Sequence, residues 1–298
     1  MEKRRLGRTG LEVSVLGSGG SEIGYHRAAP AKVATLLNRA LDAGLNLIDT
    51  AACYDISEEL IGNAIGGRRG DYYLMTKCGH SAGLPLPEWT PQLVSRSIER
   101  SLLRLRTDYI DVVQFHSCSA STLHGDDLIA ALVDARDAGH ARFIGYSGDG
   151  DDALYAIAMG VFDTLQISVN IADQEALGRI LPSAIAQDMG IIAKRPLANA
   201  AWLMSRWKVG SYDRPYWDRL RKLDYGFLRR DRGAAVGTAL RFTLSVPGVH
   251  SAIAGTTKPS RWEQNAALVA EGPLPADQYD AIRQRWAMVA RADWTGQR

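Results

Sequence analysis

The chain has 298 residues, of which 46% are hydrophobic and 23% are charged, and its 35 basic and 33 acidic side chains leave a formal charge of +2 at pH 7. This composition is ordinary for a globular protein and excludes a disordered chain, a fibre and a disulfide-stapled scaffold. The near balance of charge indicates no broad basic surface for nucleic acid or an anionic membrane. We therefore expect neither as a partner.

The three cysteines, Cys53, Cys78 and Cys118, are an odd count in a long chain. They indicate free thiols in a reducing compartment. The chain starts with Met-Glu-Lys-Arg-Arg, and no apolar stretch approaches the ~18 residues of a membrane-spanning helix. We therefore expect a cytoplasmic protein.

Short β-like runs alternate with amphipathic helical patterns from about residue 13 to about residue 270. The β-like runs are Val13–Leu16, Leu45–Ile48, Tyr72–Thr76, Ile110–Phe115, Arg142–Tyr146, Thr164–Val169, Ile191–Ala193 and Ser251–Ala254. The helical patterns cover residues 30–41, 57–65, 91–105, 128–138, 151–159, 177–188, 234–244 and 260–269. At the start of the pattern at 91–105, Thr90 and Pro91 form an N-cap and first-turn pair.

Strands separated by helices pair in parallel through right-handed crossovers. Eight such units predict a closed (β/α)8 TIM barrel, with an open, doubly wound sheet as the alternative. We expect a single barrel domain over residues 1–298, an N-terminal hairpin at 4–14 and an extra C-terminal helix at 276–290. A long, aromatic-rich loop at 197–232 lies where barrels build binding sites, although its aromatic side chains could equally cap a core.

Polar side chains end several of the predicted strands, and in a parallel barrel these ends meet at one mouth. Those residues are Asp49, Lys77, His116, Ser147 and Asn170, with Gln166 inside its run and Tyr54 five residues after Asp49. A single histidine at such a place is more often structural, and Asp49 could be an exposed N-cap. Because the position recurs from strand to strand, a shared site is the better interpretation.

This set of side chains is suited to proton donation. A tyrosine has an ordinary pKa of about 10, which a neighbouring Lys77 ammonium would lower. Asp49 could pair with Lys77, and His116 could orient a substrate oxygen. The predicted site can protonate an oxyanion but contains no reductant, so it implies a cofactor that supplies one.

The motifs that carry these residues resemble the aldo-keto reductase family. They are Gly44-Leu-Asn-Leu-Ile-Asp-Thr-Ala-Ala-Cys-Tyr54, Thr76-Lys77 and Asp111-Val-Val-Gln-Phe-His116, and the resemblance extends from Arg5 to Asn265. It implies a (β/α)8 barrel that binds NADPH or NADH without a Rossmann domain and reduces aldehydes or ketones. Tyr54 would be the general acid, tuned by Lys77 and Asp49, and His116 would orient the carbonyl.

The resemblance also implies a set of cofactor contacts. Ser147 and Gln166 would hydrogen-bond the nicotinamide carboxamide, and Arg195 and Leu197 would lie near the nicotinamide and pyrophosphate. The residues expected to grip the adenosine end are Gly255, Thr257, Lys258, Arg261, Gln264 and Asn265. Arg261 could bind a 2′-phosphate and so favour NADPH, with NADH also possible, or it could belong with Lys258 to a solvated helix turn.

Three positions depart from the family pattern. Gly148 replaces an asparagine that many members have after the serine, Gly255 replaces a lysine that some members have, and Arg195 stands where others have an aromatic residue or a serine. These departures leave one carboxamide contact and the strictness of NADPH preference open.

Other classes of protein fit the sequence less well. A Rossmann fingerprint after Gly17 fails because Glu22 occupies its last glycine position, and Tyr73 and Lys77 have short-chain dehydrogenase spacing but lie in a β-like run. Cysteines and histidines near strand ends have no usual zinc spacing. A cofactor-binding regulatory subunit or sensor of the same fold is the alternative to an enzyme.

The sequence predicts a small-molecule carbonyl substrate but not its identity, and it leaves the oligomeric state open. Five residues are candidates for the pocket wall by loop position alone: Tyr25, His26, His80, Trp89 and Trp202.

Overall fold

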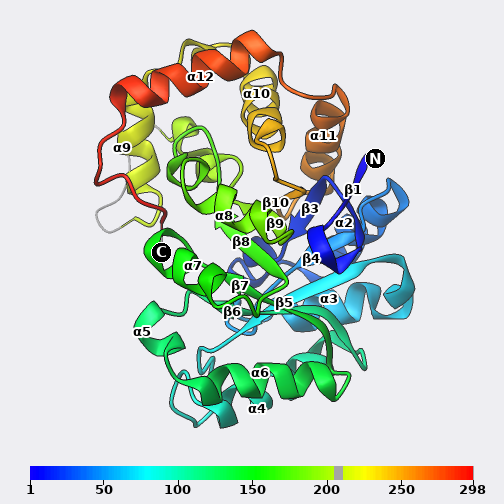
Figure 1. The fold of residues 1–298 in the computed structure, drawn as a ribbon. Helices are drawn as coiled ribbons and strands as arrows, with labels where there is room; N and C mark the ends of the chain where they lie inside the picture. The colour runs from blue at the N-terminus through cyan, green and yellow to red at the C-terminus, as the bar shows by residue number, and fades with distance from the viewer. Residues whose placement is uncertain (205–210, 298) are drawn as a thin grey trace.

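Eight parallel strands close into a barrel in the computed structural model, which describes residues 1–204 and 211–297 (Figure 1). The strands are β3 (Leu16–Gly19), β4 (Leu47–Asp49), β5 (Tyr73–Cys78), β6 (Ile110–His116), β7 (Ala141–Ser147), β8 (Thr164–Ser168), β9 (Gly190–Lys194) and β10 (Ser251–Gly255). They pair in chain order, and β10 closes the ring by pairing with both β9 and β3. This closure confirms the predicted (β/α)8 barrel and excludes the open sheet.

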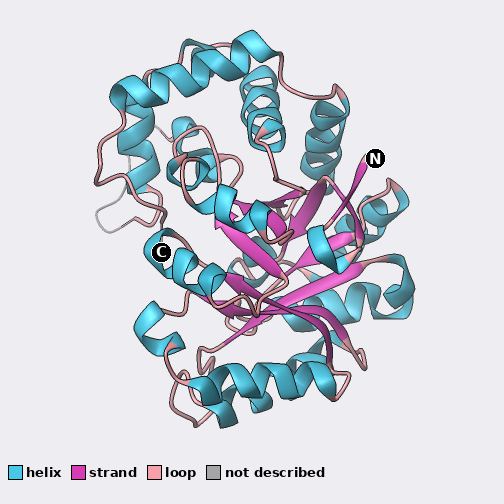
Figure 2. Cartoon of the chain, in the orientation of Figure 1, coloured by secondary structure: helices cyan, strands magenta, loops and turns pink. Residues whose placement is uncertain are grey.

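Helices surround the barrel, as Figure 2 shows. They are α1 (Ser21–Tyr25), α2 (Pro30–Asp42), α3 (Ser57–Ile65), α4 (Pro91–Leu105), α5 (Ala120–Leu123), α6 (Asp126–Asp137), α7 (Gly150–Ala158), α8 (Ile180–Ala186), α9 (Arg214–Leu223), α10 (Arg232–Ser245), α11 (Pro259–Ala270) and α12 (Ala276–Val289). Short 3-10 turns cover Gly7–Thr9, Gly66–Asp71, Glu175–Leu177, Ala198–Leu203 and Gly226–Arg229. The predicted C-terminal helix is therefore present as α12.

Helix α4 shows how local sequence sets an element. The hydroxyl of Thr90 accepts a hydrogen bond from the backbone N–H of Leu93, and Pro91 occupies the first helical position. The apolar side chains of Val94 and Ile98 are buried in the hydrophobic core. The helix ends at Arg106, whose φ of 55° is left-handed.

The N-terminal hairpin is present as β1 (Lys3–Arg5) and β2 (Glu12–Ser14), which pair antiparallel and close the amino end of the barrel. Three of its apolar side chains enter the barrel interior and pack on residues from five strands. The cluster comprises Leu6, Leu11, Val13, Leu47, Met75, Val112, Ile192 and Ile253. Gly7 has a φ of 48°, and a Cβ there would lie 2.4 Å from the backbone of Gly190. The hairpin thus lies directly against β9.

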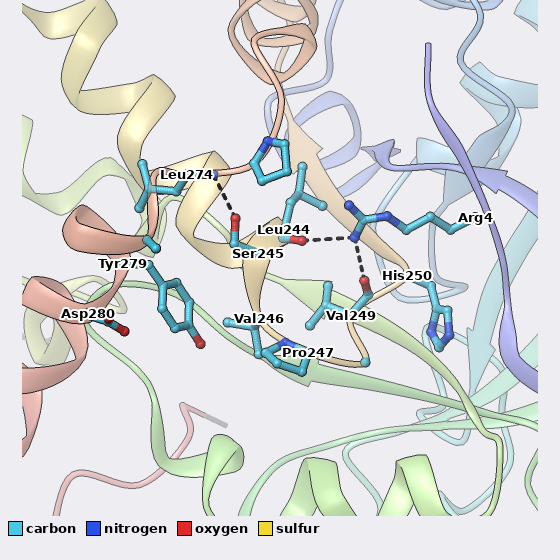
Figure 3. A pocket seen from close by; sticks show the side chains of 13 residues that line it. Arg4, Leu244, Ser245, Val246, Pro247, Val249, His250, Leu274, Tyr279 and Asp280 are labelled. Carbon is cyan, nitrogen blue, oxygen red and sulfur yellow. Dashed lines mark hydrogen bonds between the residues drawn. The ribbon is translucent and has the colours of Figure 1, made fainter.

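Arg4 anchors this hairpin to a segment that lies 240 to 245 residues later in the chain (Figure 3). Its guanidinium Nη1 donates to the carbonyl oxygens of Leu244 and Val249, each at 2.9 Å. The hollow around it, of about 590 Å³, also borders Leu274 and Tyr279. The contacts join β1 to the last turn of α10 and to the segment between α10 and β10.

The first barrel strand differs from the prediction. Val13 belongs to the hairpin strand β2, and the barrel strand begins only at Leu16 and continues through Gly17, Ser18 and Gly19. The apolar run Val13–Leu16 is therefore divided between the hairpin strand β2 and the barrel strand β3. The barrel strand contains small residues where space is short, because a Cβ at Gly17 would lie 3.1 Å from Ile253.

The segment 197–232, expected as a loop, contains the helix α9. Tyr216, Leu220 and Leu223 lie on its buried side, a spacing that the surrounding aromatic residues concealed. Tyr216 and Tyr225 are buried, while Tyr212 remains exposed. Trp207, another aromatic residue of this segment, lies outside the described residues.

Candidate active site

A cavity of about 670 Å³ opens at the carboxyl end of the barrel. Seven strands contribute a residue at or near their carboxyl end to its wall: Gly19, Asp49, His116, Ser147, Gln166, Lys194 and Gly255. Tyr54 joins them from the turn between β4 and α3. Most of the residues that the sequence singled out thus meet at one cavity. Asn170 does not line it, because it is buried and donates to the carbonyl oxygen of Arg195.

The centre of the site is a buried ion pair. Lys77 Nζ lies 2.6 Å from Asp49 Oδ2 and also donates to the carbonyl oxygen of Thr50 at 2.8 Å. Each residue is 1% exposed, so Asp49 is not a solvent-exposed N-cap. Asp49 Oδ1 accepts a 2.7 Å hydrogen bond from Gln166 Nε2. Both charges are therefore held in place by several partners.

Tyr54 lies between this ion pair and His116. Lys77 Nζ is 5.1 Å from the centre of the Tyr54 ring, and the rings of Tyr54 and His116 are 5.5 Å apart at 80°. Burial, followed by the charge of Asp49, raises the pKa of Tyr54 well above its ordinary value. The net direction differs from the expected lowering of this pKa, because burial and the charge of Asp49 outweigh any lowering by the Lys77 ammonium.

The surroundings of His116 favour the neutral imidazole. Burial, reinforced by the positive charge of Lys77, lowers its pKa well below the ordinary 6.5. Its Nδ1 lies 3.2 Å from the sulfur of Cys53, a contact that sequence reasoning did not identify. Cys53 precedes Tyr54 in the chain, but nothing in the local sequence shows that it faces a histidine from another strand.

Ser147 and Gln166 connect the nicotinamide side of the predicted site to the ion pair. Ser147 Oγ lies 3.2 Å from Gln166 Oε1, and both side chains are buried at the cavity wall. The neighbouring departure, Gly148, has a steric reason, since a Cβ there would lie 2.6 Å from the hydroxyl of Tyr146. An asparagine side chain does not fit beside that tyrosine.

A second buried charge cluster lies at the end of β9. Lys194 Nζ is 2.8 Å from Asp149 Oδ2, and Arg195 Nη1 is 3.6 Å from the same oxygen. Arg195 also donates to Ser168 Oγ at 2.6 Å and contacts the hydroxyl of Tyr212. Burial lowers the pKa of Lys194 to about 8. Arg195 and Leu197 line the cavity as expected from the sequence, and Lys194 is an addition to the predicted set.

The predicted adenosine-end residues surround the start of α11. Lys258 is exposed at its N-cap, Arg261 is half-buried, and Asn265 is buried. Within residues 1–204 and 211–297, neither Lys258 nor Arg261 pairs with an acidic side chain. The Oδ1 atom of Asn265 is buried without a hydrogen-bond partner there. Thr257 is half-buried, and Gln264 is exposed on the same helix.

These features fit a nicotinamide dinucleotide. Lys258 and Arg261, cations near the N-terminus of α11 that pair with no acidic side chain of the described residues, suit an adenosine phosphate. The unpartnered Oδ1 of Asn265, further along the same helix, can accept a hydrogen bond from an adenine amino group, and the buried hydroxyl and amide of Ser147 and Gln166 suit a carboxamide. Gly255 lies at the cavity wall, where a Cβ would lie 2.7 Å from the Glu22 side chain. A lysine at that position would displace Glu22.

Three of the five candidate pocket-wall residues gather near the mouth. The ring of Tyr25 is 5.5 Å from that of Tyr54, the ring of His80 is 5.5 Å from that of His116, and Trp89 is 5.1 Å from His80. The other two candidates have different surroundings. His26 pairs with Glu22 at the surface, and Trp202 lines a separate hollow with Met204 and Trp217.

The other classes of protein weighed from the sequence meet specific structural findings. Tyr73 and Lys77 both lie on strand β5, not on a helix, and the barrel replaces a Rossmann sheet. Cys53, Cys78 and Cys118 are free thiols, and the described residues contain no group of three or more His, Cys, Asp or Glu placed to hold a metal ion. Among the helices that the structure describes, none combines the length and apolar character needed to span a membrane.

Comparisons with known proteins agree with this architecture. The model of the Aldo/keto reductase family matches residues 15–287. L-galactose dehydrogenase of Arabidopsis thaliana is 28% identical over 289 residues, which cover 91% of this chain and 89% of the relative. Another Arabidopsis thaliana protein, named "Probable voltage-gated potassium channel subunit beta", is 27% identical over 92% of this chain and 93% of its own length.

A solved structure of an aldo-keto reductase from Bacillus halodurans matches with a TM-score of 0.82 at 24% identity, over 98% of this chain and 99% of that chain, and shows the shared fold. Because the family model covers most of a chain that closes into this barrel, the protein belongs to the aldo/keto reductase family. This is a family of oxidoreductases that use nicotinamide cofactors.

Proposed function

We propose that the protein is an NAD(P)H-dependent reductase that converts aldehydes or ketones to alcohols. The observation that carries this proposal is the buried Lys77–Asp49 pair beside Tyr54 and a neutral His116, with Asp49, Tyr54 and His116 lining one cavity. A carbonyl group that accepts a hydride needs a proton donor and groups that stabilise its oxygen. Bound NADPH, or NADH, would supply the hydride from its nicotinamide ring.

Tyr54 is the proton donor in this proposal. Its raised pKa keeps the hydroxyl protonated until negative charge develops on the substrate oxygen. Lys77, held by Asp49, provides positive charge that favours the tyrosinate as the proton leaves. His116 is neutral and therefore has one ring N–H with which to orient the carbonyl oxygen.

Cofactor binding is assigned to the cavity and to the start of α11. Ser147 and Gln166 would hold the nicotinamide carboxamide, while Arg195 and Leu197 would contact the nicotinamide and pyrophosphate region. The adenosine end would be held by Gly255, Thr257, Lys258, Arg261, Gln264 and Asn265. Lys258 and Arg261, which pair with no acidic side chain among the described residues, support a preference for NADPH over NADH.

The substrate is a small carbonyl compound that enters past Tyr25, His80 and Trp89. The name of the relative L-galactose dehydrogenase supports including sugars and their oxidised forms among the compounds tested. The three free thiols support a cytoplasmic location for the reaction.

Tyr54→Phe tests the proposal. The variant keeps the ring but removes the proton, so we expect turnover of aldehydes to fall by about two to four orders of magnitude. The affinity for NADPH, measured by fluorescence titration, should remain near that of the wild type. Tyr155→Phe, which alters a tyrosine that contacts His124 on the outer surface, is the matched control. An active Tyr54→Phe variant would reject the assigned role.

A catalytically weak, cofactor-binding regulatory subunit or sensor is the second candidate. The relative named as a potassium channel subunit beta favours it. Single-turnover oxidation of bound NADPH by a panel of aldehydes distinguishes the two candidates. Tight NADPH binding without oxidation by any compound would favour the sensor, whereas oxidation that Tyr54→Phe abolishes would favour the reductase.

A further inference from the structure

The thiol of Cys53 lies against the ring of His116. Cys53 Sγ is 3.2 Å from His116 Nδ1. Among the residues that the structure describes, Cys53 supplies the only hydrogen-bonding side-chain contact to that ring. The rings of Tyr54 and His80, each 5.5 Å from it, pack against the imidazole but leave its protonation pattern unspecified.

The backbone holds Cys53 in this position. The neighbouring Ala52 N–H donates to the carbonyl oxygen of Lys77 at 3.1 Å, and the Tyr54 N–H donates to the carbonyl oxygen of Ala51 at 3.0 Å. The first bond ties the turn after β4 to strand β5, and the second lies within the turn. These bonds therefore fix the position of the Cys53 sulfur relative to the strand-end side chains.

The chemistry of the two groups fixes the direction of the hydrogen bond. Burial, together with the charges of Lys77, His80, Lys194 and Arg195, lowers the pKa of His116, so the ring is neutral and carries one proton. Burial raises the pKa of Cys53, so its sulfur also keeps a proton. A thiol is a weak donor and a weak acceptor, whereas an unprotonated imidazole nitrogen is a good acceptor. The S–H group therefore donates to Nδ1.

We propose that Cys53 is a positioning residue: its thiol donates to Nδ1 of His116 and holds the imidazole in the tautomer whose proton is on Nε2. The inference rests on the proposed reductase function, in which His116 orients a carbonyl oxygen. A carbonyl oxygen accepts hydrogen bonds, so it is attracted by an Nε2–H group and repelled by an unprotonated Nε2. Cys53 thus determines whether His116 attracts the substrate.

Nitrogen NMR of the protein labelled with ¹⁵N-histidine, without cofactor or substrate, tests the hydrogen bond itself. Removing His116 by His116→Gln identifies its signals. We expect a proton on Nε2 and an Nδ1 resonance shifted by an accepted hydrogen bond. Cys53→Ala should return Nδ1 to the position of a free nitrogen, and Cys53→Ser, whose hydroxyl is also a donor, should retain the shift. A proton on Nδ1 in the wild type, or no change in Cys53→Ala, would overturn the proposal.

Steady-state kinetics with an aldehyde and NADPH test the consequence. We expect kcat/KM to fall about 3- to 10-fold in Cys53→Ala, the size of one lost hydrogen bond, and to recover in Cys53→Ser, with NADPH affinity unchanged. Cys118→Ala, which removes a buried thiol elsewhere, should leave kinetics unchanged, and thermal unfolding monitors the folding of all variants. Unchanged kinetics in Cys53→Ala would also overturn the proposal. A wild type that reduces no carbonyl compound would reject the reductase function while leaving the NMR result standing.

Discussion

Lys77 places a full positive charge inside the barrel, and its stability there depends on Asp49. The two charged groups are 2.6 Å apart and are together shielded from water. Attraction between buried charges only offsets the loss of their hydration, but removing one partner leaves the other uncompensated. The pair therefore acts mainly to hold charge in place beside Tyr54.

Lys77→Met is expected to lower the free energy of unfolding by about 3–5 kcal/mol, because it leaves the Asp49 carboxylate buried and unpaired. Adding Asp49→Asn should recover much of this loss, since the amide carries no charge and its oxygen can still accept from Gln166. Urea unfolding of the single and double variants gives the coupling energy. Lys32→Met, at an exposed lysine on α2, is the control, and a Lys77→Met variant as stable as this control would contradict the prediction.

At the scale of elements, the side chains of the site come from the carboxyl ends of strands and from the start of helix α11. Parallel strands end at one edge of the barrel, so one side chain per strand is sufficient to build a shared cavity. The start of α11 adds cationic groups at an end of a helix where the backbone dipole also favours an anion. In the proposed function, the same element order supplies a centre for proton transfer and a separate place for phosphate.

Arg261→Ala tests the role of α11. Loss of charge-assisted hydrogen bonds to a 2′-phosphate should weaken NADPH binding about 10- to 100-fold and leave NADH binding unchanged. Fluorescence titration of both cofactors measures the ratio, with Arg136→Ala on α6 as a control for loss of a surface charge. Equal affinity of the wild type for NADH and NADPH would refute the preference.

On the scale of the whole molecule, a buried carboxyl joins three distant parts of the chain. Asp173 Oδ2 accepts a 2.9 Å hydrogen bond from Tyr216 on α9 and lies 3.8 Å from Arg219, whose other nitrogen donates to the carbonyl oxygen of Thr295. Burial, with the nearby charge of Asp149, raises the pKa of Asp173 from 3.8 to about 7. The folded protein therefore retains a proton that the unfolded chain has lost.

This shift gives a pH dependence with a defined sign. Between about pH 4 and pH 7 the folded state binds more protons at Asp173 than the unfolded state, so this group makes stability fall as pH rises through that window. Asp173→Asn removes the effect. We expect the stability of the variant relative to the wild type to increase by about 2–4 kcal/mol between pH 4 and pH 8, as measured by urea unfolding. A relative stability that is independent of pH would contradict this assignment.

Much of the architecture follows from local sequence. The alternation of β-like runs and helical stripes predicts a parallel sheet of eight units, because strands separated by helices pair in parallel, and the structure shows that this sheet closes into a barrel. The same periodicity places Asp49, Lys77 and His116 at strand ends, and the barrel brings those ends together. Thr90 and Pro91 likewise predict the start of α4, since a cap depends on a few adjacent residues.

Tertiary structure alone decides which contacts and charges those residues experience. The split of Val13–Leu16 between hairpin and barrel, the helix α9, the rise in the pKa of Tyr54 and the Cys53–His116 hydrogen bond all differ from or add to the sequence predictions. Each depends on burial or on a partner far away in the chain. Such contacts leave no periodic signal, because the distance between two side chains across a barrel is set by the closure of the whole sheet.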